Sequence, residues 1–350
     1  MRRGARGSSS TGFTPGARPP PGCPPERVTS GGTDAVRGWS RVQVRFPFVT
    51  FPSGAQYVLR SGDQEAVIAE VGASLRSYRV GGSDVVRPYD EAEMAPAFSG
   101  MVLAPWPNRL ANGMYEYGGT VHQVAVSEPR RMTALHGLVT HVRWQTAGAS
   151  DDGTSIELIH EMVPTAGYPW PLRLVATFAL TGTGLRATIT ATNAGDSTAP
   201  YGAGVHPWLA TGGAALDACT LRVDAARHVM VDNRLLPTGT EPVTNGFDLR
   251  APKVLAGHAY DDAWTGLTRD ADGLSWVLLG RPDGTTVAMW ADEAARAWQV
   301  CTGDDVDSIK RTAVAVEPMT CVADAFRSGD DLVHLAPGDS HTMTWGLELR

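Results

Sequence analysis

Hydrophobic and polar side chains alternate with a period of two along most of the chain from about residue 44. In 172–180 one face holds Leu172, Leu174, Ala176, Phe178 and Leu180, and segments 155–162 and 185–192 alternate in the same way. This period is typical of a β-strand with one buried face. Turn-forming clusters such as SDDGT and NAGDST separate these short runs. The sequence GRPDGTT at 280–286 lies between two apolar runs and predicts a β-hairpin.

These segments predict an all-β protein built as one large antiparallel β-sandwich. The chain shows no alternation of strands with long helices and no glycine-rich phosphate loop. Only DEAEMAPAF and ADAFRSGDDLVHL are expected to hold short helical turns. A length of 350 residues is within reach of a single all-β domain, and 39 glycines and 24 prolines agree with many turns. We therefore predict one sandwich domain over residues 46–350.

Residues 1–45 differ from the rest in composition. They are rich in glycine, proline, serine and arginine, with eight arginines against Glu26 and Asp34. Such a segment buries too little apolar surface to offset its ordering entropy, so we predict a disordered tail. It lacks the apolar stretch of a secretory signal, which leads us to expect a cytoplasmic protein. No run in the chain approaches the ~20 apolar residues of a membrane helix, so no membrane partner is expected. The net charge of −7 argues against a nucleic-acid partner.

Two ionisable residues, His206 in GVHPW and Glu317 in VAVEPMT, lie in apolar surroundings directly before a proline. A residue before proline prefers extended backbone, so both side chains are expected on stiff segments. Histidine exchanges protons near neutral pH, and glutamate can serve as its counterpart. If His206 and Glu317 lie close together in the folded chain, they are expected to form a proton-transfer site. Taken singly, His206 could be an ordinary core histidine and Glu317 an exposed charge at a strand end.

Further polar residues lie in similar settings. The segment APWPNRLANG contains Asn108 and Arg109, which can donate hydrogen bonds to hydroxyl groups. Alternatively, Arg109 could simply pack on the neighbouring Trp106. His136 precedes Gly137, whose missing side chain is expected to let a ligand approach closely.

The remaining candidates are Asp261 and Asp262 in YDDAW, and Trp208. Either aspartate could accept a hydrogen bond from a sugar hydroxyl, although this segment could equally be an ordinary turn. Trp208 offers a flat apolar face to a sugar ring. The histidines show neither HxH nor HExxH spacing and the cysteines form no CxxC pair, so we expect no metal and no other cofactor.

Seven segments occur in an order that resembles the aldose 1-epimerase (galactose mutarotase) family: PWPNRLANGMYEYGG, LHGL, GYPWPLRLVATFAL, APYGAGVHPWLA, YDDAW, VEPMTCVADAF and LAPGDSHT. The resemblance runs from about residue 50 to the C-terminus. It implies a galactose mutarotase-like supersandwich that works without a metal, as a monomer or homodimer. It also implies interconversion of the α and β anomers of a free aldose such as glucose or galactose. After the His-Pro pair the family commonly has Tyr or Phe. This chain has Trp208, which puts a preference for galactose in doubt.

The resemblance also implies roles for individual residues. Glu317 matches the family's base and His206 its acid. His136 and Arg109 match the residues that hold ring and hydroxyl oxygens. Of the two aspartates, the match favours Asp261 as the one that binds a sugar hydroxyl.

Three alternatives remain open. A hexose-phosphate epimerase would need an anion site, which Arg109, Arg130 and Arg131 could form. A glycoside hydrolase would need two carboxylates at a defined separation, of which Glu317 would be one. A non-catalytic carbohydrate-binding protein would bind its sugar unchanged. The presence of both His206 and Glu317 favours an enzyme over this last alternative.

Overall fold

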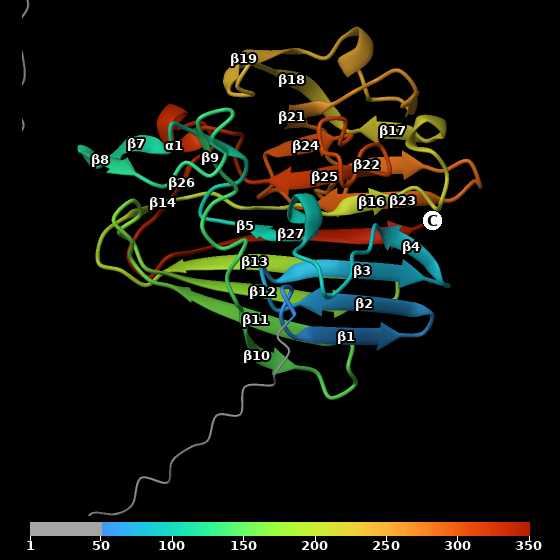
Figure 1. The fold of residues 1–350 in the computed structure, drawn as a ribbon, viewed down its shortest axis with the longest axis horizontal. Helices are drawn as coiled ribbons and strands as arrows, with labels where there is room; N and C mark the ends of the chain where they lie inside the picture. Colours follow the sequence, from blue (N-terminus) through green and yellow to red (C-terminus); the bar gives the residue numbers. More distant parts are fainter. Residues whose placement is uncertain (1–50) are drawn as a thin grey trace, which may run out of the picture. The chain divides into compact units, whose positions relative to one another are not determined.

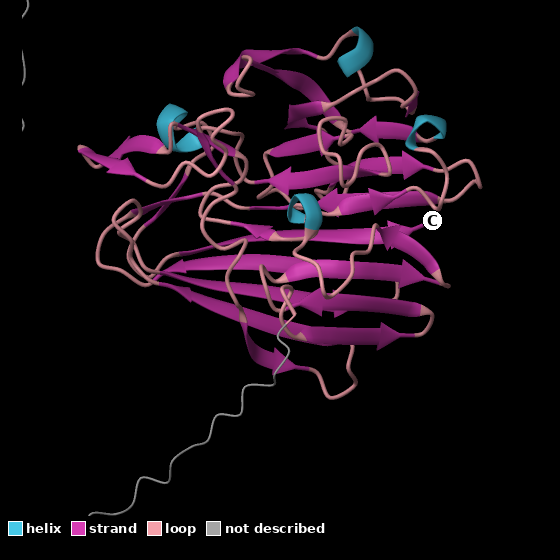
Figure 2. Cartoon of the chain, in the orientation of Figure 1, coloured by secondary structure: helices cyan, strands magenta, loops and turns pink. Residues whose placement is uncertain are grey.

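The computed structural model describes residues 51–350, in which nearly all of the regular secondary structure is antiparallel β-strand (Figures 1 and 2). The predicted all-β class and sandwich architecture are therefore confirmed. The predicted disordered tail over 1–45 lies outside the described residues, and the domain boundary at residue 46 stays a prediction.

The larger of the two main sheets has twelve strands, and all its pairings are antiparallel. Its longest path runs β1-β2-β3-β4-β16-β25-β24-β21-β18-β19, while β15 pairs with β25 and β5. The strands are β1 (Gln56–Ser61), β2 (Gln64–Ala69), β3 (Ser74–Val80), β4 (Ser83–Val86), β5 (Val102–Leu103), β15 (Gly204–Val205), β16 (Trp208–Ala210), β18 (Ala225–Val231), β19 (Pro237–Pro242), β21 (Asp261–Leu267), β24 (Ala297–Cys301) and β25 (Ala313–Met319).

The second main sheet has nine strands in the order β10-β11-β12-β13-β27-β23-β22-β17-β20. The strands are β10 (Gln145–Ala149), β11 (Ser155–Met162), β12 (Leu172–Leu180), β13 (Leu185–Asn193), β17 (Thr220–Val223), β20 (Lys253–Val254), β22 (Ser275–Gly280), β23 (Thr286–Ala291) and β27 (Ser340–Leu349). Strands β11, β12 and β13 coincide with the three segments of alternating pattern, and β22 and β23 flank the predicted hairpin turn.

Three two-stranded sheets and four short helical segments complete the described fold. The small sheets pair β6 (Arg109–Ala111) with β9 (Thr133–Leu135), β7 (Met114–Tyr117) with β8 (Thr120–Gln123), and β14 (Ala199–Tyr201) with β26 (Val333–Leu335). The helical segments are the 3-10 turns η1 (Pro96–Phe98), η2 (Leu216–Ala218) and η3 (Asn245–Phe247), and the helix α1 (Ala325–Ser328). Both predicted helical turns are present, as η1 and α1. Within residues 51–350, no helix has the length and apolar character needed to cross a membrane.

One hydrophobic core joins the two main sheets. On β12 every second side chain is buried, in register with the same alternation on β13. Phe178 on β12 packs edge-on against Trp345 of β27, and both belong to a cluster that also contains Ile68 and Tyr78 of the larger sheet. Burial of apolar area at roughly 25 cal/mol per Å² makes this core the main source of stability.

The larger sheet brings the two proline-preceding residues together. Strands β15 and β16 both pair with β25, and His206 and Pro207 form the break between them. Pro207 has no N–H to donate, but its carbonyl accepts a hydrogen bond from Val316 N–H at 3.1 Å. The interruption therefore keeps the chain beside β25 at the position of Glu317.

Candidate functional site

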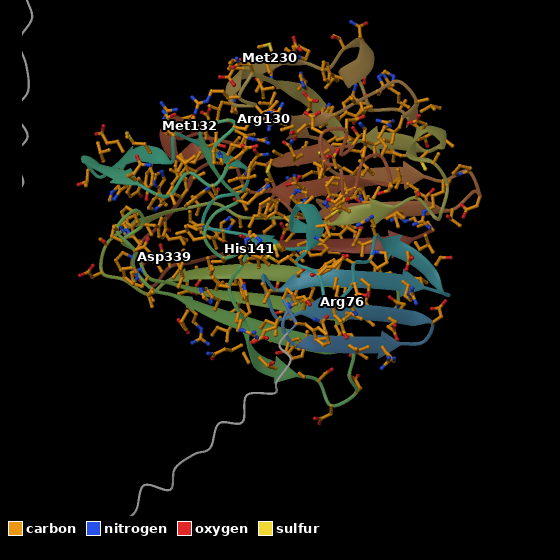
Figure 3. The ribbon with its side chains drawn as sticks, in the orientation of Figure 1. Arg76, Arg130, Met132, His141, Met230 and Asp339 are labelled. Atoms are coloured by element: carbon orange, nitrogen blue, oxygen red, sulfur yellow. The ribbon has the colours of Figure 1, made fainter. Side chains whose placement is uncertain are left out.

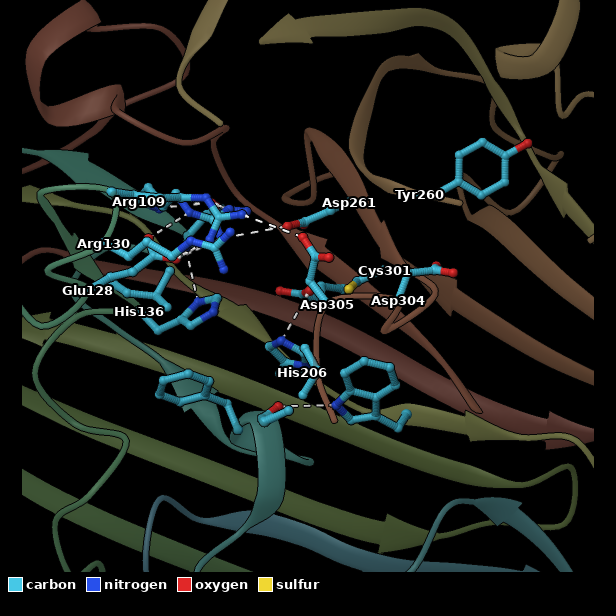
Figure 4. A pocket seen from close by; sticks show the side chains of 18 of the residues that line it. Arg109, Glu128, Arg130, His136, His206, Tyr260, Asp261, Cys301, Asp304 and Asp305 are labelled. Atoms are coloured by element: carbon cyan, nitrogen blue, oxygen red, sulfur yellow. Dashed lines mark hydrogen bonds and ion pairs between the residues drawn. The ribbon is translucent and has the colours of Figure 1, made fainter. Parts of the chain in front are cut away.

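A cavity of about 470 Å³ opens beside β25 (Figure 4). All the residues predicted from the sequence for the site, apart from Asp262, line this one cavity: Asn108, Arg109, His136, His206, Trp208, Asp261 and Glu317. They come from segments up to about two hundred residues apart. The sequence alone could not show that these residues lie side by side in the folded chain.

His206 and Glu317 form the buried centre of the cavity. The distance from His206 Nε2 to Glu317 Oε1 is 3.3 Å, and the residues are 6% and 2% exposed. The backbone of His206 is fixed on both sides, because its N–H donates to Met101 O at 3.1 Å and its carbonyl accepts from Gly100 N–H at 2.8 Å. His206 Nδ1 and Glu317 Oε2 have no hydrogen-bond partner among the described residues. Such unmet bonding capacity is typical of a site built for a ligand.

Burial controls the protonation of this pair. It raises the pKa of Glu317 well above the usual carboxyl value, with Asp261 adding to the rise and Arg109 opposing it. It also lowers the pKa of His206 to about 4. Both shifts favour the neutral forms, a protonated Glu317 and an unprotonated His206, so the first proton of the pair resides on Glu317. A pair that shares one proton offers one proton donor and one proton acceptor.

Aromatic rings pack around the pair. Trp208 stacks on His206 with ring centroids 5.6 Å apart, and its Nε1 donates to Ala97 O at 3.1 Å. Phe98 lies 4.6 Å from the His136 ring and 6.2 Å from the His206 ring. Trp208 lines the cavity as predicted, and it also fixes the orientation of His206. Phe98, at the end of η1, was not expected at the site, because the DEAEMAPAF segment predicts a helical turn and gives no sign of which side chain meets the cavity.

The small β6–β9 sheet carries the next group. Arg109 pairs in register with Leu135, so His136 follows directly at the end of β9. Asn108 and His136 have positive φ values of 55° and 61°, and such left-handed backbone in non-glycine residues often occurs at functional sites. The carbonyl of Asn108 accepts from His136 N–H at 2.8 Å. Asn108 Oδ1 accepts from Arg109 N–H at 2.9 Å. The amide oxygen of Asn108 is therefore committed to shaping the site.

The expectation for Gly137 is wrong. Its φ is 75°, and a Cβ placed on it would lie 2.0 Å from the carbonyl oxygen of Ala104. The missing side chain makes room for the neighbouring backbone and not for a ligand.

Glu128 is a member of the site that the sequence did not reveal. It receives two hydrogen bonds from Arg109, from Nε to Oε2 at 2.9 Å and from Nη2 to Oε1 at 3.2 Å. Thr133 Oγ1 donates to Oε2 at 2.6 Å, and Arg131 Nη1 donates to Oε1 at 2.9 Å. Burial alone would raise the pKa of Glu128, but the hydrogen bonds from Arg109 and Thr133 outweigh it and hold the pKa below its ordinary value. Glu128 thereby orients Arg109 toward the cavity.

We expect Glu128→Gln to weaken substrate binding more than turnover. The substitution removes one charge-assisted hydrogen bond from the buried Arg109, an interaction worth roughly 1.5–3 kcal/mol. KM should rise about tenfold while kcat changes less, as measured by steady-state kinetics. The exposed Glu116, for which we find no polar side-chain contact among the described residues, provides the matched control as Glu116→Gln. An unchanged KM in Glu128→Gln would show that Arg109 does not depend on this carboxylate.

The two aspartates lie on opposite faces of β21, which begins at Asp261, so the alternative of a turn is wrong. Asp261 lines the cavity, accepts from Gln299 Nε2 at 2.8 Å, and lies 3.6 Å from Arg109 Nη2. Asp262 points away and contacts His228 Nε2 at 3.0 Å. Because successive side chains of β21 point to opposite faces, Asp261 is the aspartate that can reach a ligand in the cavity.

His136, His206 and Glu317 are close enough to raise the question of a metal, since their ligand atoms lie within 4.8 Å of one another. However, the Nδ1 of His136 accepts a hydrogen bond from Asn108 N–H at 3.2 Å. The hydrogen of the neutral ring is then on Nε2, which can donate but has no lone pair for a metal. The pKa of His136 is lowered well below its usual value, first by burial and then by His206 and Arg109, so the ring stays neutral. The cluster suits hydrogen bonding to oxygen atoms better than metal ligation.

Comparisons with known proteins identify relatives of this chain in sequence and in fold. A family model described as aldose 1-epimerase matches residues 55–348. The uncharacterized protein YihR of Escherichia coli is 32% identical over 299 residues, which cover 84% of this chain and 93% of YihR. The crystal structure of a GalM/aldose epimerase homologue from C. elegans superposes with a TM-score of 0.76 at 18% identity, covering 85% of this chain and 98% of that one. Galactose 1-epimerase from Lactobacillus acidophilus superposes with a TM-score of 0.72 at 18% identity, covering 84% and 93%.

Proposed function

Because the chain belongs to the aldose 1-epimerase family, we propose that it interconverts the α and β anomers of an aldose with a free anomeric carbon. The observation that carries the proposal is the buried contact of 3.3 Å between His206 and Glu317 inside a cavity of sugar size. The proposed reaction needs one proton donor and one proton acceptor, and it needs no cofactor.

In the proposed mechanism, Glu317 takes the proton from the anomeric hydroxyl while His206 gives a proton to the ring oxygen. This requires the shared proton of the pair to be on His206 when the sugar is bound. The short contact between Nε2 and Oε1 provides a path for that transfer. The C1–O5 bond then breaks, and the sugar becomes an open-chain aldehyde. Rotation about C1–C2 presents the other face of the carbonyl, and O5 closes on it with the proton transfers reversed.

The surrounding residues would hold the sugar during this rotation. Arg109 and the Nε2–H of neutral His136 are donors for ring and hydroxyl oxygens. Asp261, beside Arg109, is an acceptor for a hydroxyl, and its contact with Gln299 fixes its direction. These donors and this acceptor would keep the sugar in place while only C1 and O5 react.

The experiment that tests the proposal is polarimetry of freshly dissolved α-D-glucose and α-D-galactose with the wild-type protein. Faster relaxation to the anomeric equilibrium than in buffer alone supports the proposal. Binding of either sugar without acceleration would indicate a carbohydrate-binding protein. Release of the aglycone from an aryl glycoside would indicate a hydrolase.

We expect the enzymatic rate to be greatest where the His206–Glu317 pair holds one proton. Since the pKa of His206 is lowered to about 4, protonation below that pH places two protons on the pair and leaves no acceptor. Because the pKa of Glu317 is raised, the pair loses its last proton only at a pH well above the usual carboxyl range. Above that pH the rate should fall, because the pair no longer has a proton to donate. A pH profile of kcat/KM, corrected for the uncatalysed rate at each pH, checks this. An acid limb near the ordinary histidine pKa of about 6.5 would contradict it.

A further inference from the structure

Arg130 is a lining residue of the cavity that the proposed reaction does not use. It lies in the turn between Glu128 and Thr133 and is exposed at the surface (Figure 3). In Figure 4 it lies on the same side of the cavity as Arg109 and Glu128, with Asp304 on the other side. Among residues 51–350 we find no hydrogen bond or ion pair for its guanidinium.

The other charged groups of the cavity are paired. Glu317 contacts His206, and each of the other four lining carboxylates has an arginine within 4.0 Å: Glu128 has Arg109 and Arg131, Asp261 has Arg109, Asp304 has Arg311, and Asp305 has Arg131. Arg109 and Arg131 thus have acidic partners in Glu128, Asp261 and Asp305. Among the lining arginines of the described residues, Arg130 alone keeps a guanidinium without a partner, so it is free to bind an anion that enters the cavity.

The position of Arg130 also fixes which part of a sugar it could meet. The proposed chemistry places C1 and O5 at the buried His206–Glu317 pair. The part of the ring farthest from C1 would then face the mouth, where Arg130 lies exposed. A planar guanidinium binds phosphate, sulfate or carboxylate through two parallel hydrogen bonds, whereas it gains little from a neutral hydroxyl that water can replace.

We propose that the preferred substrate is an aldose that carries a negatively charged group away from its anomeric carbon, and that Arg130 selects this group. This inference rests on the proposed anomerase function and specifies the class of its substrate. The charged group could be a phosphate or sulfate ester or a carboxylate, because all present oxygen atoms in the geometry that the guanidinium fork matches.

The test compares kcat/KM for glucose 6-phosphate, glucose 6-sulfate, glucuronic acid and glucose, each corrected for its uncatalysed rate. Exchange NMR at the anomeric equilibrium measures all four with the full-length protein. For wild type, at least one charged sugar should exceed glucose about tenfold or more, and the best of the three identifies the kind of anion. In Arg130→Gln the ratio of kcat/KM for the best charged sugar to kcat/KM for glucose should fall about tenfold, since one charge-assisted interaction is lost. Raising the salt concentration should lower the same ratio for the wild-type protein.

Arg296 supplies the matched control. It is exposed and lies outside the cavity, and we find no hydrogen bond or ion pair for its guanidinium within residues 51–350. Arg296→Gln should keep the wild-type ratio. If glucose is turned over at least as well as every charged sugar, or if Arg130→Gln leaves the ratio unchanged, the inference is overturned while the proposed function stands. If the protein accelerates none of the four sugars, nor galactose, the proposed function itself fails.

Discussion

Replacing Glu317 by glutamine is expected to lower kcat/KM for anomer interconversion by about 10²–10⁴-fold, the usual contribution of a positioned acid or base. Glutamine has nearly the same shape and fits the same buried position. It can neither take the proton of the anomeric hydroxyl nor carry the shared proton of the pair. The rate should therefore approach that of buffer alone, as measured by polarimetry.

The same substitution should make the protein more stable at neutral pH. The pKa of Glu317 is raised in the folded state, so as the pH rises the unfolded chain releases this proton before the folded protein does. Folding is therefore penalised as pH rises above the ordinary carboxyl pKa, and glutamine removes this penalty. Thermal unfolding at pH 7 should give a higher Tm for Glu317→Gln, and the difference should shrink near pH 4. A folded Glu317→Gln variant with full activity would contradict the assigned role.

His206→Asn is expected to cause a loss of similar size, about 10²–10⁴-fold in kcat/KM. Asparagine cannot exchange a proton in the accessible pH range, so ring opening loses its acid. The backbone bonds that fix this position, to Gly100 and Met101, do not depend on the side chain, so the strand break should survive. A modest drop in Tm is expected, because Trp208 loses its stacking partner.

Two controls separate chemistry from structure in this case. His160 on β11 is half-buried outside the cavity, and His160→Asn should retain the wild-type rate. The double variant Glu317→Gln, His206→Asn should be hardly slower than either single variant, because the two groups act as one unit. Losses that multiply in the double variant would argue that the two residues act independently.

The strands of the sandwich could be predicted because their pattern is local. β11, β12 and β13 expose one face to solvent, and the period of two marks them directly in the sequence. Short strands such as β15 and β16 carry too few residues for any period to show. They exist because long-range pairing with β25 defines them.

The candidate site could be predicted only in part, for a related reason. His206 and Glu317 stand out as ionisable residues before prolines in apolar segments, and the family resemblance supports their pairing. Glu128 has no such signal, because its importance comes from contacts with Arg109 and Thr133 that exist only in the folded chain. The choice between Asp261 and its neighbour likewise depends on which face of β21 meets the cavity.

The central claim is that His206 and Glu317 together open the sugar ring. The most direct test follows the optical rotation of freshly dissolved α-D-glucose, and of glucose 6-phosphate, with wild type, Glu317→Gln and His206→Asn at equal concentration and pH 7. The account predicts that wild type alone accelerates relaxation of at least one of the two sugars, while both variants remain folded by circular dichroism. Equal acceleration by wild type and either folded variant would contradict it.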